Sequence, residues 1–158
     1  MRILLCILCS IFVGCAILKP VDSKTFADIS GYKYAIIGQT QTLSSSVGGG
    51  FIDYATGGGI NIGKSINPSD VITGILIKKG LVIVDKPKDS KTLLVKYGQG
   101  DKRNVLGGLG GYTLEVSIQI LDALTQEPLF LCTAEGQGST EADDLREAIT
   151  RCLGDFNP

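Results

Sequence analysis

Residues 58–65, GGINIGKS, match the pattern of a phosphate-binding loop that starts at Gly58 and ends with Lys64 and Ser65. In a working loop the helix begins at the Gly-Lys-Ser step, so that its amides bind the phosphates and the serine hydroxyl contacts magnesium. Here Pro68 would fall in the second turn of that helix, where a ring clash and a lost hydrogen bond cost about 3 kcal/mol. We therefore interpret the match as accidental and expect neither a nucleotide nor any other cofactor.

Acid–base and nucleophilic chemistry is limited by composition, because the chain has no histidine. A Ser-His-Asp triad, a Cys-His pair and a histidine-ligated metal are excluded, and we expect no metal site. Glu135 could act as an acid, but one carboxylate without a partner identifies no reaction. Asp143 and Asp144 fall at a helix start, where negative charge offsets the helix dipole without any catalysis. We expect a protein that is not an enzyme, with a hydrolase using paired carboxylates as the alternative.

Length and charge point to one folded domain that does not bind nucleic acid. The 158 residues are 44% hydrophobic, which is too apolar for a disordered chain. The 15 Lys and Arg are balanced by 16 Asp and Glu without a basic cluster, which argues against nucleic acid as a partner.

The amino-terminal residues indicate export. Arg2 precedes a mostly apolar run over residues 3–13, too short for a membrane span. The residues FVGC, ending at Cys15, resemble the lipobox of bacterial lipoproteins. That resemblance implies cleavage before Cys15 and attachment of a diacylglyceryl group to its thiol. The alternative is signal-peptidase cleavage after Ala16, which would leave a secreted protein without lipid.

The rest of the chain divides into a tether over residues 15–30 and one domain over residues 31–158, after a lipoprotein signal peptide over residues 1–14. Cys132 and Cys152 would remain in an oxidising compartment, where they could form a disulfide. Cys152 falls on the apolar stripe of a helix and Cys132 in a strand that the helix could cover, so the pattern favours buried free thiols and leaves a disulfide as the alternative.

The periodicity of the domain predicts strands and two helices. Asn67 and Thr140 are expected helix caps, each followed by apolar residues at helical spacing. Residues 112–121 alternate apolar with polar side chains, which is typical of a strand with one covered face. Further strands are expected at residues 32–37, 81–84, 92–97 and 129–135. Together these patterns predict an α+β, two-layer sandwich: one mixed, mostly antiparallel sheet of about five strands, with two helices on one face.

A glycine-rich loop at residues 44–66 is the expected contact surface. Two triple-glycine tracts flank Phe51, Asp53 and Tyr54, and loops on a rigid scaffold often carry recognition. The alternative is a disordered connector with no binding role.

Two segments resemble small lipoproteins of the Bacteroidales: NPSDVI, which begins at Asn67, and CTAEGQGSTEADD, which begins at Cys132. The resemblance implies a lipid-anchored protein of the bacterial cell envelope, and Ala16, with no acid beside Cys15, suggests the outer membrane facing the periplasm. It transfers no activity. We expect a binding or accessory subunit with an envelope protein as partner; the alternatives are an envelope hydrolase and an oligomeric assembly subunit.

Overall fold

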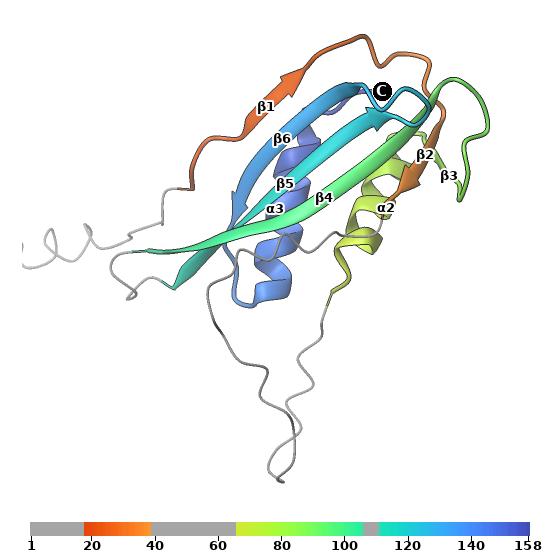
Figure 1. Ribbon diagram of the computed structural model, residues 1–158. Coiled ribbons are helices and arrows are strands. Elements are labelled where there is room, and N and C mark those ends of the chain that lie inside the picture. Colours follow the sequence, from red (N-terminus) through yellow and green to blue (C-terminus); the bar gives the residue numbers. More distant parts are fainter. Residues whose placement is uncertain (1–17, 39–65, 106–110) are drawn as a thin grey trace, which may run out of the picture.

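The computed structural model describes residues 18–38, 66–105 and 111–158 (Figure 1). Three predicted features lie outside these ranges: Cys15, the match to a phosphate-binding loop, and the contact residues Phe51, Asp53 and Tyr54. Within the described ranges, no helix has both the length and the apolar character needed to cross a membrane.

The centre of the molecule is a mixed six-stranded sheet with the strand order β1-β6-β5-β4-β2-β3. Strands β4, β5, β6 and β1 pair antiparallel, whereas β2 runs parallel to both β4 and β3. The strands are β1 (Asp22–Thr25), β2 (Tyr34–Ile37), β3 (Val82–Ile83), β4 (Thr92–Asn104), β5 (Tyr112–Asp122) and β6 (Pro128–Gly136). The predicted α+β class is confirmed, with six strands in the sheet.

Strand β1 corrects the prediction that residues 15–30 are a tether. All four of its residues are exposed, yet Asp22 and Lys24 stand opposite Thr133 and Leu131 of β6. An edge strand that buries neither face needs no apolar alternation, so the sequence pattern could not reveal it.

Strand β4 is longer than predicted, because it continues from Tyr97 to Asn104. This extension contains Gly98, Gly100 and several charged residues, which have low strand propensity. Pairing with β5 holds it in place, with one irregularity between Gln99 and Lys102. The long β4–β5 pair therefore extends the sheet well beyond the end of β2.

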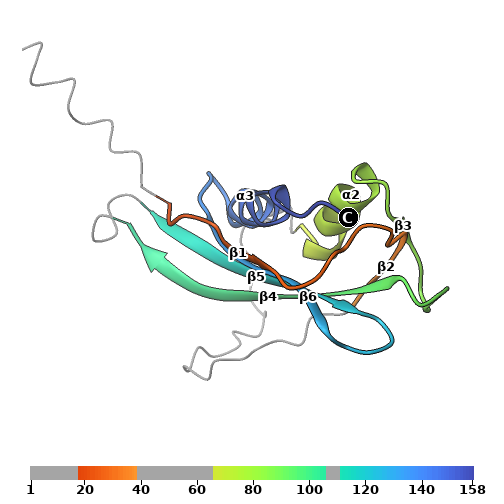
Figure 2. The ribbon, with the colours of Figure 1, turned by 90° about the horizontal axis from the view of Figure 1, so that it is seen from above.

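Both helices begin where their caps predict. The Asn67 side chain accepts a hydrogen bond from the Ser69 amide at 3.1 Å, and α2 spans Pro68–Lys78. The Thr140 hydroxyl accepts from the Asp143 amide at 3.2 Å, and α3 spans Glu141–Gly154. Figure 2 shows both helices on the same side of the sheet.

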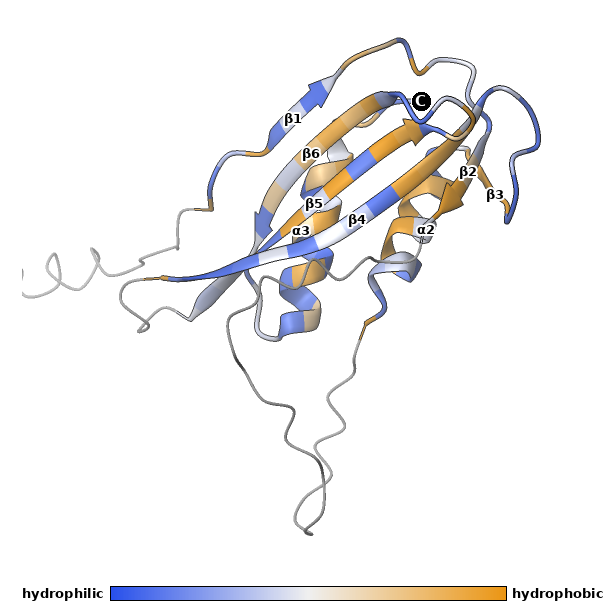
Figure 3. Cartoon of the chain, in the orientation of Figure 1, coloured by the Kyte–Doolittle hydropathy of each residue, from blue (hydrophilic) through white to orange (hydrophobic). Residues whose placement is uncertain are grey.

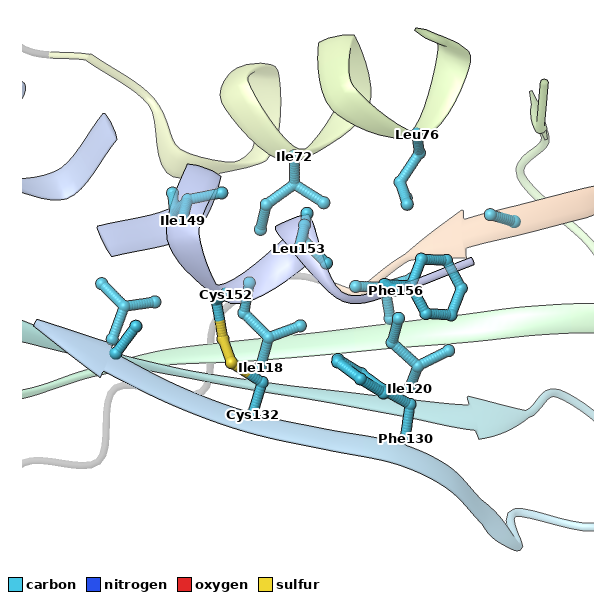
Figure 4. Packing of buried hydrophobic residues seen from close by; sticks show 14 of the residues in the cluster. Ile72, Leu76, Ile118, Ile120, Phe130, Cys132, Ile149, Cys152, Leu153 and Phe156 are labelled. Atoms are coloured by element: carbon cyan, nitrogen blue, oxygen red, sulfur yellow. A yellow bond between two sulfur atoms is a disulfide. The ribbon is translucent and has the colours of Figure 1, made fainter. Parts of the chain in front are cut away.

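The core lies between the helices and the sheet. Phe130 of β6 and Phe156, just beyond α3, pack with their rings tilted by 56° and their centroids 5.3 Å apart (Figure 4). Around this pair the buried side chains come from both layers: Ile72, Leu76, Ile118, Ile120, Ile149 and Leu153.

A disulfide joins the two layers. Cys132 of β6 and Cys152 of α3 are bonded, with their Cα atoms 5.6 Å apart. The expectation of free thiols is wrong, although both residues are buried as expected. The sequence places Cys152 on an apolar stripe and Cys132 in a strand, but only the packing of α3 on β6 reveals that the two positions meet.

Gly136 lets α3 approach the end of β6 closely. A Cβ atom built at this residue would lie 1.9 Å from the Asp144 carbonyl oxygen and 2.6 Å from the Ala148 amide nitrogen. Both obstacles are backbone atoms of a helix, which cannot move aside like the tip of a side chain. The position therefore requires glycine.

We expect Gly136→Ala to lower the free energy of unfolding by about 3 kcal/mol, because the added methyl overpacks the helix–sheet contact. Gly74→Ala is the matched control. Gly74 lies inside α2 with no atom within 4 Å of a built Cβ. This control should raise stability by about 0.5–1 kcal/mol through helix propensity. Urea denaturation measures both changes, and a Gly136→Ala variant as stable as the wild type would contradict the packing argument.

Candidate functional site

The face of the sheet opposite the helices carries a depression of about 660 Å³, which we call the open-face groove. Figure 1 looks onto this face, and Figure 3 shows hydrophilic and hydrophobic residues alternating along β5. The alternation sends Ile118 and Ile120 into the core and leaves Ser117 and Gln119 exposed on the other face. One strand pattern thus builds both the core and the groove.

Two rows of cross-strand partners line the groove. In the first row, Lys24, Leu131, Gln119 and Lys96 follow one another across β1, β6, β5 and β4. Leu131 is half-buried, so an apolar side chain lies between Lys24 and Gln119, whereas Gln119 is directly next to Lys96. This row offers two ammonium groups and one amide to a partner.

The second row has smaller side chains, and the two at its centre are uncharged. It follows Asp22, Thr133, Ser117 and Gly98 across the same four strands. The hydroxyls of Ser117 and Thr133 lie 3.1 Å apart in a hydrogen bond. Because Gly98 contributes no side chain, the surface is hollow at this side of the row.

Beyond these rows, two carboxylates stand opposite each other. Glu135 of β6 and Glu115 of β5 are cross-strand partners, a placement that is destabilising for like charges unless cations compensate. Two cations do so. Arg103 donates from Nε to Glu135 Oε1 at 3.0 Å and from Nη2 to Oε2 at 2.6 Å. The Lys19 Nζ lies 3.1 Å from Glu135 Oε1 and 3.8 Å from Glu115 Oε2. We call these four residues the Glu135 cluster.

The cluster keeps Glu135 ionised. Its side chain is only 3% exposed, yet the hydrogen bonds from Arg103 outweigh burial and, with help from Lys19, lower its pKa to about 2. A general acid working on paired carboxylates needs the opposite shift, to a pKa near the working pH. The strand register therefore places Glu115 beside Glu135, as the hydrolase alternative requires. The low pKa of Glu135, however, suits a carboxylate that stays ionised.

Lys19 is fastened to the domain at its backbone as well. Its amide donates to Glu135 Oε2 at 3.1 Å, and its carbonyl accepts from Arg151 Nη2 at 2.8 Å. Arg151 also donates to the Glu135 carbonyl through Nη1. The sequence pattern had placed Lys19 in a tether, and no local feature of residues 15–30 indicated these contacts.

The acids at the start of α3 have structural roles. Asp143 accepts hydrogen bonds from Thr140 Oγ1 at 2.8 Å and Ser139 Oγ at 2.9 Å, as expected of a capping residue. Asp144 is buried, which raises its pKa, and it accepts from the Gly138 amide. Both residues therefore order the turn between β6 and α3.

Asp122 has a similar role at the opposite end of the sheet. Its Oδ1 accepts from the amides of Leu124 and Thr125, and its Oδ2 accepts from the Tyr32 hydroxyl at 2.9 Å. Burial and this hydrogen bond raise the pKa of Tyr32 to about 12. The Asp122 carboxylate therefore closes the β5–β6 turn. Within the residues that the structure describes, no cluster of three or more His, Cys, Asp or Glu could hold a metal ion.

Comparisons with known proteins support the fold. No family model and no curated protein matches the chain. The PelC dodecamer from Paraburkholderia phytofirmans is similar at 14% identity and a TM-score of 0.55, covering 89% of this chain and all of that chain. A single-residue variant of that dodecamer matches at 13% identity and a TM-score of 0.54, over 87% of this chain and 95% of that one. A PDZ domain protein from Parabacteroides distasonis matches at 13% identity and a TM-score of 0.50, over 90% of this chain but 36% of its own. At these identities the shared feature is the fold.

We expect Glu135→Gln to remove a pH-dependent part of the stability. The folded pKa of about 2 lies below the usual 4.5, so the ionised carboxylate stabilises the fold above pH 4.5. This stabilisation is lost as the pH falls from 4.5 to 2. The shift corresponds to at most about 3 kcal/mol, and screening of the partly exposed cations lowers the expected effect to about 2 kcal/mol.

Denaturant unfolding at several pH values between 7 and 2 measures this difference. Glu141→Gln is the control, because its ion pair with Lys102 is exposed on both sides and should contribute less than about 1 kcal/mol. Stability profiles of Glu135→Gln and wild type that remain parallel across this interval would show that the Glu135 charge does not stabilise the fold.

Proposed function

We propose that the protein is a lipid-anchored subunit of the bacterial cell envelope, on the outer membrane facing the periplasm, and that it binds an envelope partner through the open-face groove. The anchor rests on the lipobox-like sequence at Cys15 and the export signal before it. The disulfide between Cys132 and Cys152 supports an oxidising compartment.

The groove is the observation that carries the binding role. Both helices cover one face of the sheet, and the other face holds a hollow of about 660 Å³. Its lining offers ammonium, amide and hydroxyl groups around the half-buried Leu131, which suits a polar partner with a small apolar contact. Phe51, Asp53 and Tyr54 remain a predicted contact loop in addition to this surface.

The hydrolase alternative is weaker. It needs one carboxyl that holds a proton near neutral pH, but Arg103 lowers the pKa of Glu135 to about 2. Glu135 therefore fits a binding subunit, in which a permanent negative charge holds a neighbouring segment in place.

Two measurements in cells test this proposal. Intact-mass analysis should find an acylated Cys15 on the wild-type protein, and Cys15→Ala should move from the membrane to the soluble fraction. A photo-crosslinking residue at Gln119 should give a discrete adduct, and Ser117→Arg, which fills the groove from an exposed position, should remove most of it.

The control position for the crosslinker is Lys78, which is exposed on α2, away from the groove. An adduct that forms equally from Lys78 and Gln119 would exclude the groove as the specific surface. An unmodified Cys15 thiol on the native protein would exclude the lipid anchor.

Self-assembly is a second candidate function. The fold is shared with chains of the PelC dodecamer over 87–89% of this chain. Ile77 at the end of α2 and Val82 in β3 are 56% and 54% exposed, and the Leu81 amide donates to Leu76, so the two elements adjoin. Exposed apolar side chains beside an edge strand are a feature of surfaces that pair with other chains.

If copies associate through this edge, Ile77→Lys with Val82→Lys should convert an oligomer into a monomer, because charges would be buried at the contact. Light scattering coupled to size-exclusion chromatography measures the mass. Leu124→Lys is the matched control, since Leu124 is 59% exposed but lies in the β5–β6 turn. A wild-type protein that is monomeric at every concentration would rule out this candidate.

A further inference from the structure

The segment that enters the domain is held at Lys19 through the amide, the ammonium and the carbonyl of that residue. Its amide and ammonium groups both contact the Glu135 carboxylate, at 3.1 Å each, and its carbonyl accepts from Arg151 at 2.8 Å. Glu135 is itself buried and receives two hydrogen bonds from Arg103. Lys19 is therefore bound by strand β6 and helix α3 together.

The chain after Lys19 has little freedom to move away from the sheet. Asp22, three residues later, already pairs with Thr133. Going along the chain from Cys15, Lys19 is therefore where the described contacts with the sheet and α3 begin.

The chain before Lys19 is short. Cys15 precedes it by four residues, which span at most about 14 Å when fully extended. By contrast, β4 has 13 residues and is about 40 Å long. A lipid on Cys15 would keep the Lys19 end of the sheet within about 14 Å of the bilayer, whereas the other end, about 40 Å away along the sheet, has no such restraint.

The end near Lys19 is identified by its contacts. It carries Arg103 at the end of β4, Glu135 at the end of β6 and, through the ion pair of Lys102 with Glu141, the start of α3. The β5–β6 turn, with Leu124, lies at the other end of the sheet (Figure 1).

We infer that the Glu135-cluster end of the domain is held at the membrane, within the reach of the four residues that follow Cys15, and that the β5–β6 turn at the other end of the sheet lies farther from the bilayer on average. The partner surface is the lipid headgroup layer. This inference rests on the proposed lipid anchor at Cys15.

The test uses the full lipidated protein in phosphatidylcholine vesicles that contain a headgroup-labelled quencher lipid. A fluorescent amino acid is placed at Asp101, exposed near the cluster, or at Leu124. We expect strong quenching at position 101 and weak quenching at position 124. Equal quenching, or stronger quenching at position 124, would overturn the inference.

Three variants test whether the short connection between Cys15 and Lys19 sets the difference in quenching. Inserting about 12 Gly and Ser residues between Ile17 and Leu18 lengthens the connection without changing the residues that bind Lys19, and should remove most of the difference in quenching between the two labels. Glu135→Gln should reduce the difference less than the insertion does, because weakening the contacts of Lys19 frees only the residues before Asp22, which still pairs with Thr133. Glu141→Gln, at the same end, should leave the difference intact. A difference that survives the insertion would overturn the inference.

The outcome is distinguishable from failure of the proposed function. Intact mass first establishes whether Cys15 carries lipid, and a protein without lipid contradicts the anchor itself. Lipidated protein with equal quenching at both positions contradicts the orientation alone.

Discussion

The contact between α3 and β6 determines how the two faces of the sheet are used. At Gly136 the helix backbone approaches the strand so closely that no Cβ would fit, and the Cys132–Cys152 disulfide joins the same elements. Because α3 and α2 both pack on this side, the apolar side chains of β4, β5 and β6 are buried there. The polar side chains of the same strands are left on the opposite face, where they form the open-face groove.

The Glu135 cluster links this architecture to the amino-terminal segment. Glu135 is near the end of β6, Arg103 near the end of β4, and Arg151 on α3. Each therefore depends on a different element for its position: Glu135 and Arg151 contact Lys19 directly, and Arg103 holds the Glu135 carboxylate. This is a strong local constraint, because a buried carboxylate that loses its donors is left as an unpaired buried charge, which is costly.

Much of the fold could be predicted from local patterns. The alternation along β5 and the Asn67 and Thr140 caps each depend on neighbouring residues, and all are found in the structure. Strand β1 could not be predicted, because its exposed residues are held by backbone pairing with β6.

The candidate site was largely hidden for the same reason. Glu115 is 20 residues from Glu135 in the sequence, and only the strand register places them opposite each other. The disulfide likewise depends on how a helix crosses a strand, which periodicity does not specify. The alternation over residues 112–121 predicts that one face of the sheet is polar and uncovered. The hollow in that face could not be predicted, because it comes from glycine in β4 and from the pairing of four strands.

Strand β1 also has a mechanical consequence. Hydrogen bonds in an antiparallel pair run perpendicular to the strands, so tension applied along β1 would load its bonds to β6 together, in shear, instead of opening them in succession. The ionic contacts at Lys19 lie first in the path of that load. A pull from the amino terminus would thus be opposed first by the contacts of Lys19 and then by the β1–β6 hydrogen bonds acting together.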